Sequence, residues 1–346
     1  MLENPITIRP LRLVELLDAA FRLYRRNFLT FIGIMALVTI PVSLLSLTTN
    51  VVLTQSLGQL SGPGGVFSPQ YFIGMGGTLL VAILSFFLVR GLATAALTRT
   101  IATSFLGGRL GILESYHMMG SSLGNLLLSL LLAGLISLGL GIWVLIPCVG
   151  WISGIGMALY FGLVVIQLLI PVVVLEKRGP MDALRRAWDL ARRRFWWFLG
   201  LAGVLYLLNL VLAGPAVLIN YLLQFGLQGM NTTILGVVVQ SLVNMLVALI
   251  YQPLVLSVMV LAYFDLRVRS EGFDLAMQSI SGTDYPDPLD SIAAAPAAPQ
   301  QTALITGMEF GYFVAATLGG ALLLALAYGT LATLGFGIMR LFTQGS

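Results

Sequence analysis

Separated runs of apolar residues, each about 20 residues long or longer, constrain this chain more than any other feature of its sequence. A run of that length crosses a hydrocarbon core of about 30 Å as a helix. An outer-membrane barrel would instead show segments of about 10 residues with alternating polarity, and these runs are continuous. The predicted spans cover residues of about 28–47, 71–92, 125–145, 151–175, 195–217 and 233–263.

The composition favours the same class. Charged residues make up 9% of the 346 residues and hydrophobic residues 58%, whereas a soluble domain is roughly a quarter charged. A soluble fold of this length could not bury that much apolar surface. We therefore predict an all-α polytopic membrane protein, with a six-span membrane domain over residues 1–280 built as a six-helix bundle of three hairpin modules.

A charged amphipathic segment over residues 11–27 precedes the first span, with apolar side chains at helical spacing. We expect this elbow to lie in the headgroup plane, as amphipathic helices beside spans do. The arginines of this elbow, and of a similar segment before the fifth span, are candidates to bind anionic lipid headgroups. They are Arg22, Arg25, Arg26, Arg185, Arg186, Arg192, Arg193 and Arg194.

The two elbow segments also form an internal repeat. The stretch AAFRLYRRNFLTFIGI, which begins at Ala19, aligns without a gap on RAWDLARRRFWWFLGL, which begins at Arg186. Both copies precede a span of the same direction, so the repeat is parallel. The middle hairpin, around residues 113–132, matches only weakly. Two interpretations stay open: duplication of a stable unit, or a pseudo-symmetric bundle around a lipid or solute path.

The placement of charge predicts the orientation. If the first six spans alternate, almost all arginines and lysines fall on one side, which the positive-inside rule makes cytoplasmic. We expect a multi-pass protein of the cell (inner) membrane with a cytoplasmic N-terminus. The formal charge of +4 is then explained by topology and anionic lipid, with no nucleic-acid partner.

The composition changes near residue 281. Residues 281–304 are rich in Pro, Ala and Asp and predict a flexible linker, and residues 305–342 predict a seventh, C-terminal transmembrane helix. One tilted crossing is chosen over two short ones, which puts the C-terminus outside, although Arg340 conflicts with that placement. Ala315, Gly319 and Gly320 form a strip of small residues. We expect this strip to contact another subunit or a larger membrane complex, or to close a lateral opening.

Arg90 is a charge within the second apolar run. It is interpreted either as an arginine that reaches the headgroups or pairs inside the bundle, or as part of a transport pathway.

No residues indicate catalysis, a cofactor or a metal. His117 is the only histidine, with Glu114 three residues before it, and Cys148 is expected to be a buried, inert thiol. The acidic residues Asp265, Glu271 and Asp274 alternate with arginines, which favours a solvated helix exit with local ion pairs over a metal site.

Three segments carry a family resemblance: RPLRLVELLDAAFRLYRRNF, VVVLEKRGPMDALRRAWDLARRRFWWFLG and LAYFDLRVRSEGFDLAM. They resemble the membrane domain fused to some bacterial glycerophosphodiester phosphodiesterases and its stand-alone relatives, over roughly Arg9 to Met277. The resemblance implies a six-span domain with no established activity of its own. The catalytic barrel of those enzymes is missing here, so no catalytic residue is carried over.

The sequence leads to two main functional hypotheses. The first is a non-catalytic membrane component that organises lipid or docks a partner complex. The alternative is a transporter or lipid-translocating protein, which predicts a polar cavity between the modules. An enzyme that acts on lipid is the third and least supported hypothesis.

Overall fold

The computed structural model describes residues 10–58, 69–120, 122–226, 232–280, 288–299 and 305–322, with only the backbone at 216–226, 232–233, 280 and 288. These residues form helices and connecting turns, with no strand among them. Within the described ranges, six helical segments are long and apolar enough to cross a membrane, which confirms the class of all-helical membrane protein. They are Phe28–Leu57, Pro69–Phe105, Leu123–Val144, Gly150–Leu175, Phe195–Pro215 and Ile234–Glu271.

Four of these spans are uninterrupted α-helices, and two contain wider π-helical turns. The uninterrupted helices are α2 (Phe28–Gly58), α6 (Leu123–Val144), α10 (Phe195–Gly226) and α11 (Thr232–Glu271). The second span consists of α3 (Pro69–Leu84), the π-helix η2 (Ser85–Ala93) and α4 (Thr94–Phe105). The fourth consists of η3 (Gly150–Gly154), α7 (Ile155–Tyr160), η4 (Phe161–Val165) and α8 (Ile166–Leu175). π-Helical turns are rare and often occur at functional sites.

Two short helices precede spans in the same way. α1 (Leu13–Arg26) and α9 (Pro180–Arg193) are both 14 residues long. A single turn residue, Asn27 or Arg194, separates each from the span that follows, and these two turn residues occupy aligned positions in the repeat. The short helix of the middle hairpin, α5 (Ile112–His117), has 6 residues and does not reproduce this length. The common length and break position support the repeat, which stays an interpretation.

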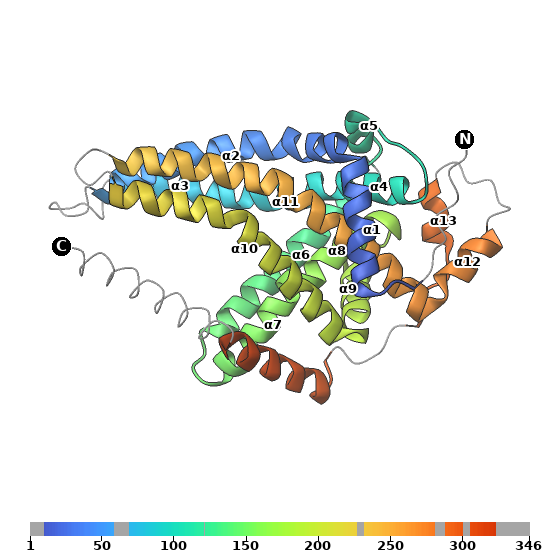
Figure 1. The fold of residues 1–346 in the computed structure, drawn as a ribbon. Helices are drawn as coiled ribbons and strands as arrows, with labels where there is room; N and C mark the ends of the chain where they lie inside the picture. The colour runs from blue at the N-terminus through green and yellow to red at the C-terminus, as the bar shows by residue number, and fades with distance from the viewer. Residues whose placement is uncertain are drawn as a thin grey trace, which may run out of the picture.

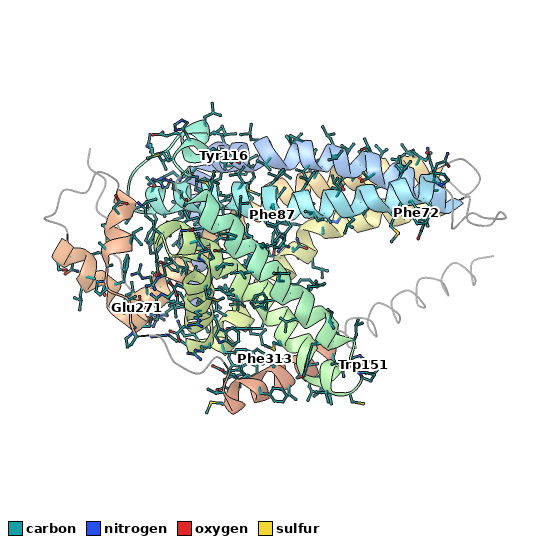
Figure 2. All side chains as sticks on the ribbon, turned by 180° about the vertical axis from the view of Figure 1, so that it is seen from behind. Phe72, Phe87, Tyr116, Trp151, Glu271 and Phe313 are labelled. Atoms are coloured by element: carbon teal, nitrogen blue, oxygen red, sulfur yellow. The ribbon has the colours of Figure 1, made fainter. Side chains whose placement is uncertain are left out.

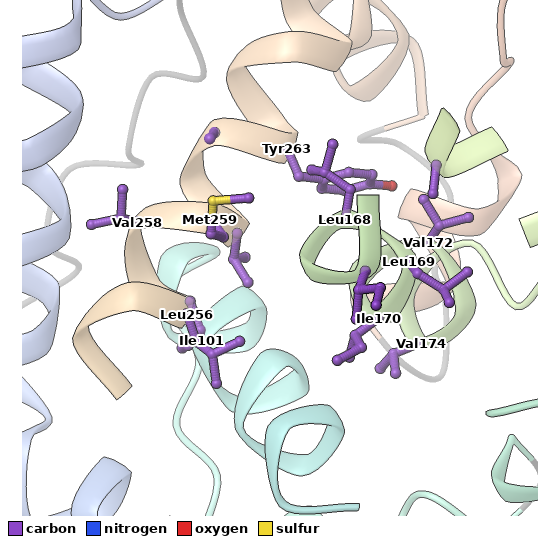
Figure 3. Close-up of a cluster of buried hydrophobic side chains, with 14 of the residues drawn as sticks. Ile101, Leu168, Leu169, Ile170, Val172, Val174, Leu256, Val258, Met259 and Tyr263 are labelled. Atoms are coloured by element: carbon purple, nitrogen blue, oxygen red, sulfur yellow. The ribbon is translucent and has the colours of Figure 1, made fainter. Parts of the chain in front are cut away.

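The core lies where α4, α8 and the second half of α11 meet (Figure 3). Every residue of α4 is buried, and so is nearly every residue of α8. The close-up shows Ile101 of α4, side chains of α8 such as Leu168, and Leu256 and Met259 of α11 in one cluster. These three helices form a hub on which the outer helices pack.

The spans extend from this hub in two directions (Figure 1). α2, α3, α10 and α11 form one long arm, in which α2 contacts both α3 and α11, and α10 contacts α11. The hairpin of α6 and α7 points another way, so that Phe72 at the tip of the arm and Trp151 at the tip of the hairpin lie well apart (Figure 2). α1, α9, α12 (Phe273–Ile280) and α13 (Pro288–Ala294) gather at the opposite end, here called the charged end.

The predicted flexible linker is wrong for residues 288–299. α13 forms within it, and Leu289 and Ile292 are fully buried. Two carbonyl oxygens of this segment, those of Ile292 and Ala295, accept hydrogen bonds from the buried Arg267 at 3.2 and 3.4 Å. Buried apolar side chains and backbone carbonyls therefore dock this part of the segment on the charged end. Residues 281–287 and 300–304 lie outside the described residues.

The C-terminal segment is helical over residues 307–322 and packs on its own chain. Phe313 is buried against Tyr160, Trp188 and Phe195. The Thr317 hydroxyl accepts a hydrogen bond of 2.8 Å from the backbone N–H of Gly156. Contact with the hairpin and with α9 thus uses the face that carries Phe313 and Thr317. The remainder of the predicted seventh span, 323–342, lies outside the described residues.

The predicted strip of small residues faces away from this contact. A Cβ atom at Gly319 or Gly320 would meet no atom within 4 Å, and Ala315 is exposed. The expectation that the strip closes an opening in its own chain is therefore wrong for the described residues. Its contact with another subunit stays a prediction.

Substitution of Gly156 by alanine should displace the C-terminal helix. The added Cβ would lie 2.2 Å from the carbonyl oxygen of Phe313 and 2.7 Å from the Thr317 hydroxyl, so backbone must move. Gly162→Ala is the matched control, since a Cβ there meets nothing within 4 Å. Limited proteolysis in detergent should cut Gly156→Ala faster near residues 305–322. Equal cleavage of the two variants would contradict the close packing.

Candidate functional site

A cavity of about 370 Å³ lies where the long arm joins the hub. Four elements line it: the π-helix η2 with the start of α4, then α8, α10 and α11. Its polar lining residues are Arg90, Thr94, Gln167, Asn209, Asn244, Tyr251 and Gln252. The rest of the lining is apolar: Ile166, Ile170, Ala213, Val247, Ala248, Val255 and Leu256. Ligand sites combine an apolar wall with a few polar groups in this way, at volumes of about 300–1,000 Å³.

The cavity lies within the apolar spans. Arg90 is about 15 residues before the end of α4, and Gln252 is about 19 residues before the end of α11, which correspond to roughly 22 and 28 Å along the helices. The polar side chains are thus set well back from the charged end. Polar groups at such depth are costly to bury and typically mark binding or transport sites.

Arg90 belongs to the π-helix η2. The hydroxyl of the next lining residue, Thr94, donates to the carbonyl oxygens of Arg90 and Gly91, the latter at 3.1 Å. The Gly91 carbonyl also accepts from the backbone N–H of Thr94, so the hydroxyl adds a further bond at the end of the π-helical turn. The backbone around Arg90 is thereby held, while its side chain makes no hydrogen bond or ion pair with any described residue and borders the cavity.

Four amide side chains complete the polar wall. The Oδ1 atom of Asn244 accepts a hydrogen bond of 2.9 Å from Gln240. The Oε1 atom of Gln252 is buried and has no hydrogen-bond partner among the described residues. A buried acceptor without a donor costs about 1–3 kcal/mol, so the wall is incomplete without water or a ligand. The Tyr251 hydroxyl donates to the carbonyl of Leu205 at 2.7 Å and braces α10 against α11.

The charged end holds the hub together through a buried ion cluster of Glu176, Arg186, Arg267 and Glu271. Arg186 is fully buried; it donates to Glu271 at 2.7 Å, and its Nε lies 3.2 Å from Glu176. Arg267 donates to Glu271 at 3.0 Å, and the Tyr263 hydroxyl donates to Glu176 at 2.8 Å. Two cations and two anions make up the cluster, and Arg178 at its edge also donates to Glu176 at 2.7 Å. The cluster ties α9, α11 and the α8–α9 turn into one unit, seen around Glu271 in Figure 2.

Burial by itself lowers the pKa of the Arg186 guanidinium, but hydrogen bonds and charges from Glu271 and Glu176 outweigh it and raise that pKa above its usual value. Arg186 therefore stays positively charged within the buried ion cluster.

A second group of charges centres on Asp189 of α9. Arg192 and Arg193 donate to its two oxygens at 2.7 and 2.8 Å, and Arg192 also lies 3.6 Å from Glu309 of the C-terminal helix. Burial alone raises the pKa of Asp189, but the hydrogen bonds from Arg193 and Arg192 outweigh it and hold the pKa below its ordinary value of 3.8. This group joins the elbow to the C-terminal helix.

A third group centres on Asp265 of α11. Arg269 and Arg194 lie 3.0 and 3.3 Å from it, and the backbone N–H of Leu11 donates to it at 2.7 Å. The start of the chain, the α9–α10 turn and α11 thus converge on one carboxylate.

The predicted lipid-binding arginines divide into two sets. Arg22, Arg25, Arg26 and Arg185 are exposed, and their binding of headgroups stays a prediction. Arg186 and Arg192 are buried and paired with carboxylates, so the prediction is wrong for them. Arg193 and Arg194 are half-buried and paired with Asp189 and Asp265. Packing of the elbow α9 against α6 and α8 explains the difference.

The remaining candidate residues do not come together in one site. His117 is exposed, and Glu114 accepts from the backbone N–H of Gly111 rather than pairing with it. Cys148 is exposed in a left-handed turn, with φ of 65°, so the expectation of a buried thiol is wrong. Asp265 and Glu271 form the expected ion pairs with arginines, but they are buried rather than solvated. Among the described residues no group of three potential metal ligands occurs.

A second hollow, of about 870 Å³, lies between α2 and α5. Its lining is apolar except for Glu114, and includes Gly33, Ile40, Pro41 and Leu113. It offers few polar groups to orient a ligand, which leaves the cavity at Arg90 as the stronger site.

The chain matches one known family of domains. The profile of a domain of unknown function (DUF7847) matches residues 11–266. The chain belongs to this family. No curated protein and no solved structure matches the chain, and nothing links it to the membrane domain of the phosphodiesterases, so that resemblance stays an expectation. The DUF7847 region contains the whole cavity, whereas α12, α13 and the C-terminal helix follow it.

Replacement of Arg186 by methionine should destabilise the hub. It removes the cation that bridges Glu176 and Glu271, leaving Glu176 with Arg178 and Glu271 with Arg267, and breaking a buried pair costs about 3–5 kcal/mol. Arg185→Met, at the exposed neighbour, is the control. Thermal unfolding in detergent should show a clearly lower midpoint for Arg186→Met only. Equal midpoints would show that the cluster contributes little.

Asp189 should make stability depend on pH in the acid range. Because its folded-state pKa lies below 3.8, the ionised carboxylate stabilises the fold above pH 3.8, and this is lost as the pH falls through the folded-state pKa. Asp189→Asn should unfold more readily at pH 7 and lose less stability between pH 5 and 3. Asp18→Asn, at an exposed carboxylate of α1, should follow the unsubstituted protein. Parallel curves for all three would contradict the assignment.

Proposed function

We propose that this protein moves or presents a polar-headed amphiphile within the membrane, through the cavity at Arg90. The observation that carries the proposal is the cluster of one arginine and four amide side chains from four different spans, set in an otherwise apolar wall. A polar cavity between spans supports the transport hypothesis. No carboxylate, histidine or cysteine is among the described residues that line the cavity, and the proposal includes no catalytic step.

The proposal includes an orientation of the protein in the membrane. Most charges lie at the end that carries α1, α9 and α12, which by the positive-inside rule faces the cytoplasm of a cell membrane. The arm and the hairpin then point toward the other leaflet. A polar cavity between them is suitably placed to accept a headgroup, while the apolar side chains contact the acyl chains.

The hypothesis of a docking or lipid-organising component stands as a second proposal. The exposed Arg22, Arg25, Arg26 and Arg185 support an interaction with anionic lipid. Its sharpest form is association with a larger membrane complex. The C-terminal helix packs on its own hairpin through Phe313 and Thr317, while the face with Ala315, Gly319 and Gly320 stays open to a partner. The cavity is preferred as the basis for function because it combines polar groups from several spans.

Transport through the cavity is tested with proteoliposomes that carry headgroup-labelled phospholipids, by following the label's exposure to an impermeant quencher. The unsubstituted protein should raise exposure above empty vesicles. The double variant Asn244→Leu, Gln252→Leu should abolish the rise, because it removes two polar wall groups at similar volume. Asn50→Leu is the control, an amide on α2 outside the cavity lining. No rise with any headgroup class would count against the proposal.

A further inference from the structure

Arg90 is the one charged side chain among the described residues that line the cavity. The other polar groups there are neutral amides and hydroxyls. The buried Arg186 and Arg192 of the charged end pair with the carboxylates of Glu271 and Asp189. Arg90 is exposed at the cavity, and no described carboxylate lies within ion-pair distance of it.

The missing counter-charge indicates the ligand's sign. A cation at this depth within the apolar spans is costly in a membrane unless water or an anion in the cavity stabilises it. A guanidinium presents its N–H donors as a rigid fork that matches the oxygens of a phosphate or a carboxylate. Amide N–H groups from Asn209, Asn244 or Gln167 can add donors to the same anion.

The amides also indicate a second ligand group. The Oε1 atom of Gln252 is a buried acceptor without a donor among the described residues. A ligand that carries a hydroxyl or an ammonium beside its anionic group would satisfy it. Phosphate esters of glycerol or of ethanolamine combine these features. The apolar wall, with Ile166, Ile170 and Val255, suits an attached acyl chain.

We propose that the cavity is an anion site in which Arg90 binds the phosphate of a phosphate ester and Gln252 accepts a hydrogen bond from the neighbouring hydroxyl or ammonium. The inference deepens the function proposed above and rests on the same cavity. The phosphate comes either from a lipid headgroup or from a free phosphate ester, and the experiment separates these sources.

Binding is measured on the purified full chain in a neutral detergent, with dihexanoyl phosphatidylglycerol as the lipid probe, glycerol 3-phosphate as the free ester and dihexanoyl phosphatidylcholine as a probe without net charge or donor. The anionic lipid should bind more tightly than phosphatidylcholine. Arg90→Gln should weaken it by about ten-fold or more, the effect of a lost charge-assisted hydrogen bond. Arg90→Lys should bind with intermediate affinity, because it keeps the charge without the fork.

Arg185→Gln is the matched control, since Arg185 is an exposed arginine remote from the cavity lining. If Arg90→Gln fails to fold, Gln252→Leu carries the test and should weaken phosphatidylglycerol more than phosphatidylcholine. Tighter binding of glycerol 3-phosphate than of the lipid would assign the site to a free ester. Equal affinity of the unsubstituted protein and Arg90→Gln, or an equal loss in Arg185→Gln, would overturn the anion site.

The two proposals fail separately. Loss of anion binding in Arg90→Gln together with no lipid movement in proteoliposomes would keep the anion site and reject transport. Lipid movement that is unchanged in Arg90→Gln would keep transport and reject the anion site.

Discussion

Arg186, fully buried between Glu176 and Glu271, fixes the geometry on which the other parts of the structure depend. Its two partners come from the end of α8 and the end of α11, so one guanidinium sets how the elbow α9 meets both hub helices. Arg267 completes the balance and, through carbonyl oxygens of Ile292 and Ala295, holds α13 in place. Replacing a whole buried ion pair by apolar residues is often neutral for stability, whereas removing one partner is strongly destabilising. Here the pairs hold α9 against the end of α11, directly before the turn that leads into α10.

The two copies of the repeat differ in how the turn residue after each short helix is held. Arg194 is the single turn residue between α9 and α10, and it pairs with Asp265, which also binds the start of the chain at Leu11. Asn27 is the corresponding residue between α1 and α2, and it caps its own helix by donating to the carbonyl of Leu23 at 3.1 Å. One break is therefore fixed by long-range charge and the other locally. A shared ancestry of the segments would explain the common length, while the different partners explain why the two halves differ in burial.

The class of the fold and its long helices could be predicted because apolar length and helical periodicity are local signals. Whether the elbow arginines are buried or exposed could not be predicted. Periodicity places Arg186 and Asp189 on the polar face of α9, but it does not say whether that face meets water or another polar surface. The partner Glu271 lies 85 residues away.

α13 was also missed, because its two buried apolar residues, Leu289 and Ile292, are too few to form a pattern. The cavity amides were also missed: Gln167 and Asn209 each stand alone in an apolar run, and Asn244 shares the sixth run with Gln240 and Gln252. The usable signal was that three separate runs each carried such an amide, with Arg90 in a fourth.

α11 joins the cavity to the charged end. It is one helix of 40 residues, about 60 Å long, and it carries both the wall residues Asn244 and Gln252 and the ion-paired Asp265 and Glu271. Pro253 lies inside this helix, directly after Gln252 and before the ion-paired residues. A proline removes one hydrogen bond of the helical ladder and favours a kink, so α11 has a natural bending point between the cavity wall and the ion cluster. The other breaks lie at Asn27, at Arg194 and at the π-helical turns of the second and fourth spans. Movement that opens the cavity is therefore expected at the joints between hub and arm, where Pro253 also lies, with the charged end as the anchor.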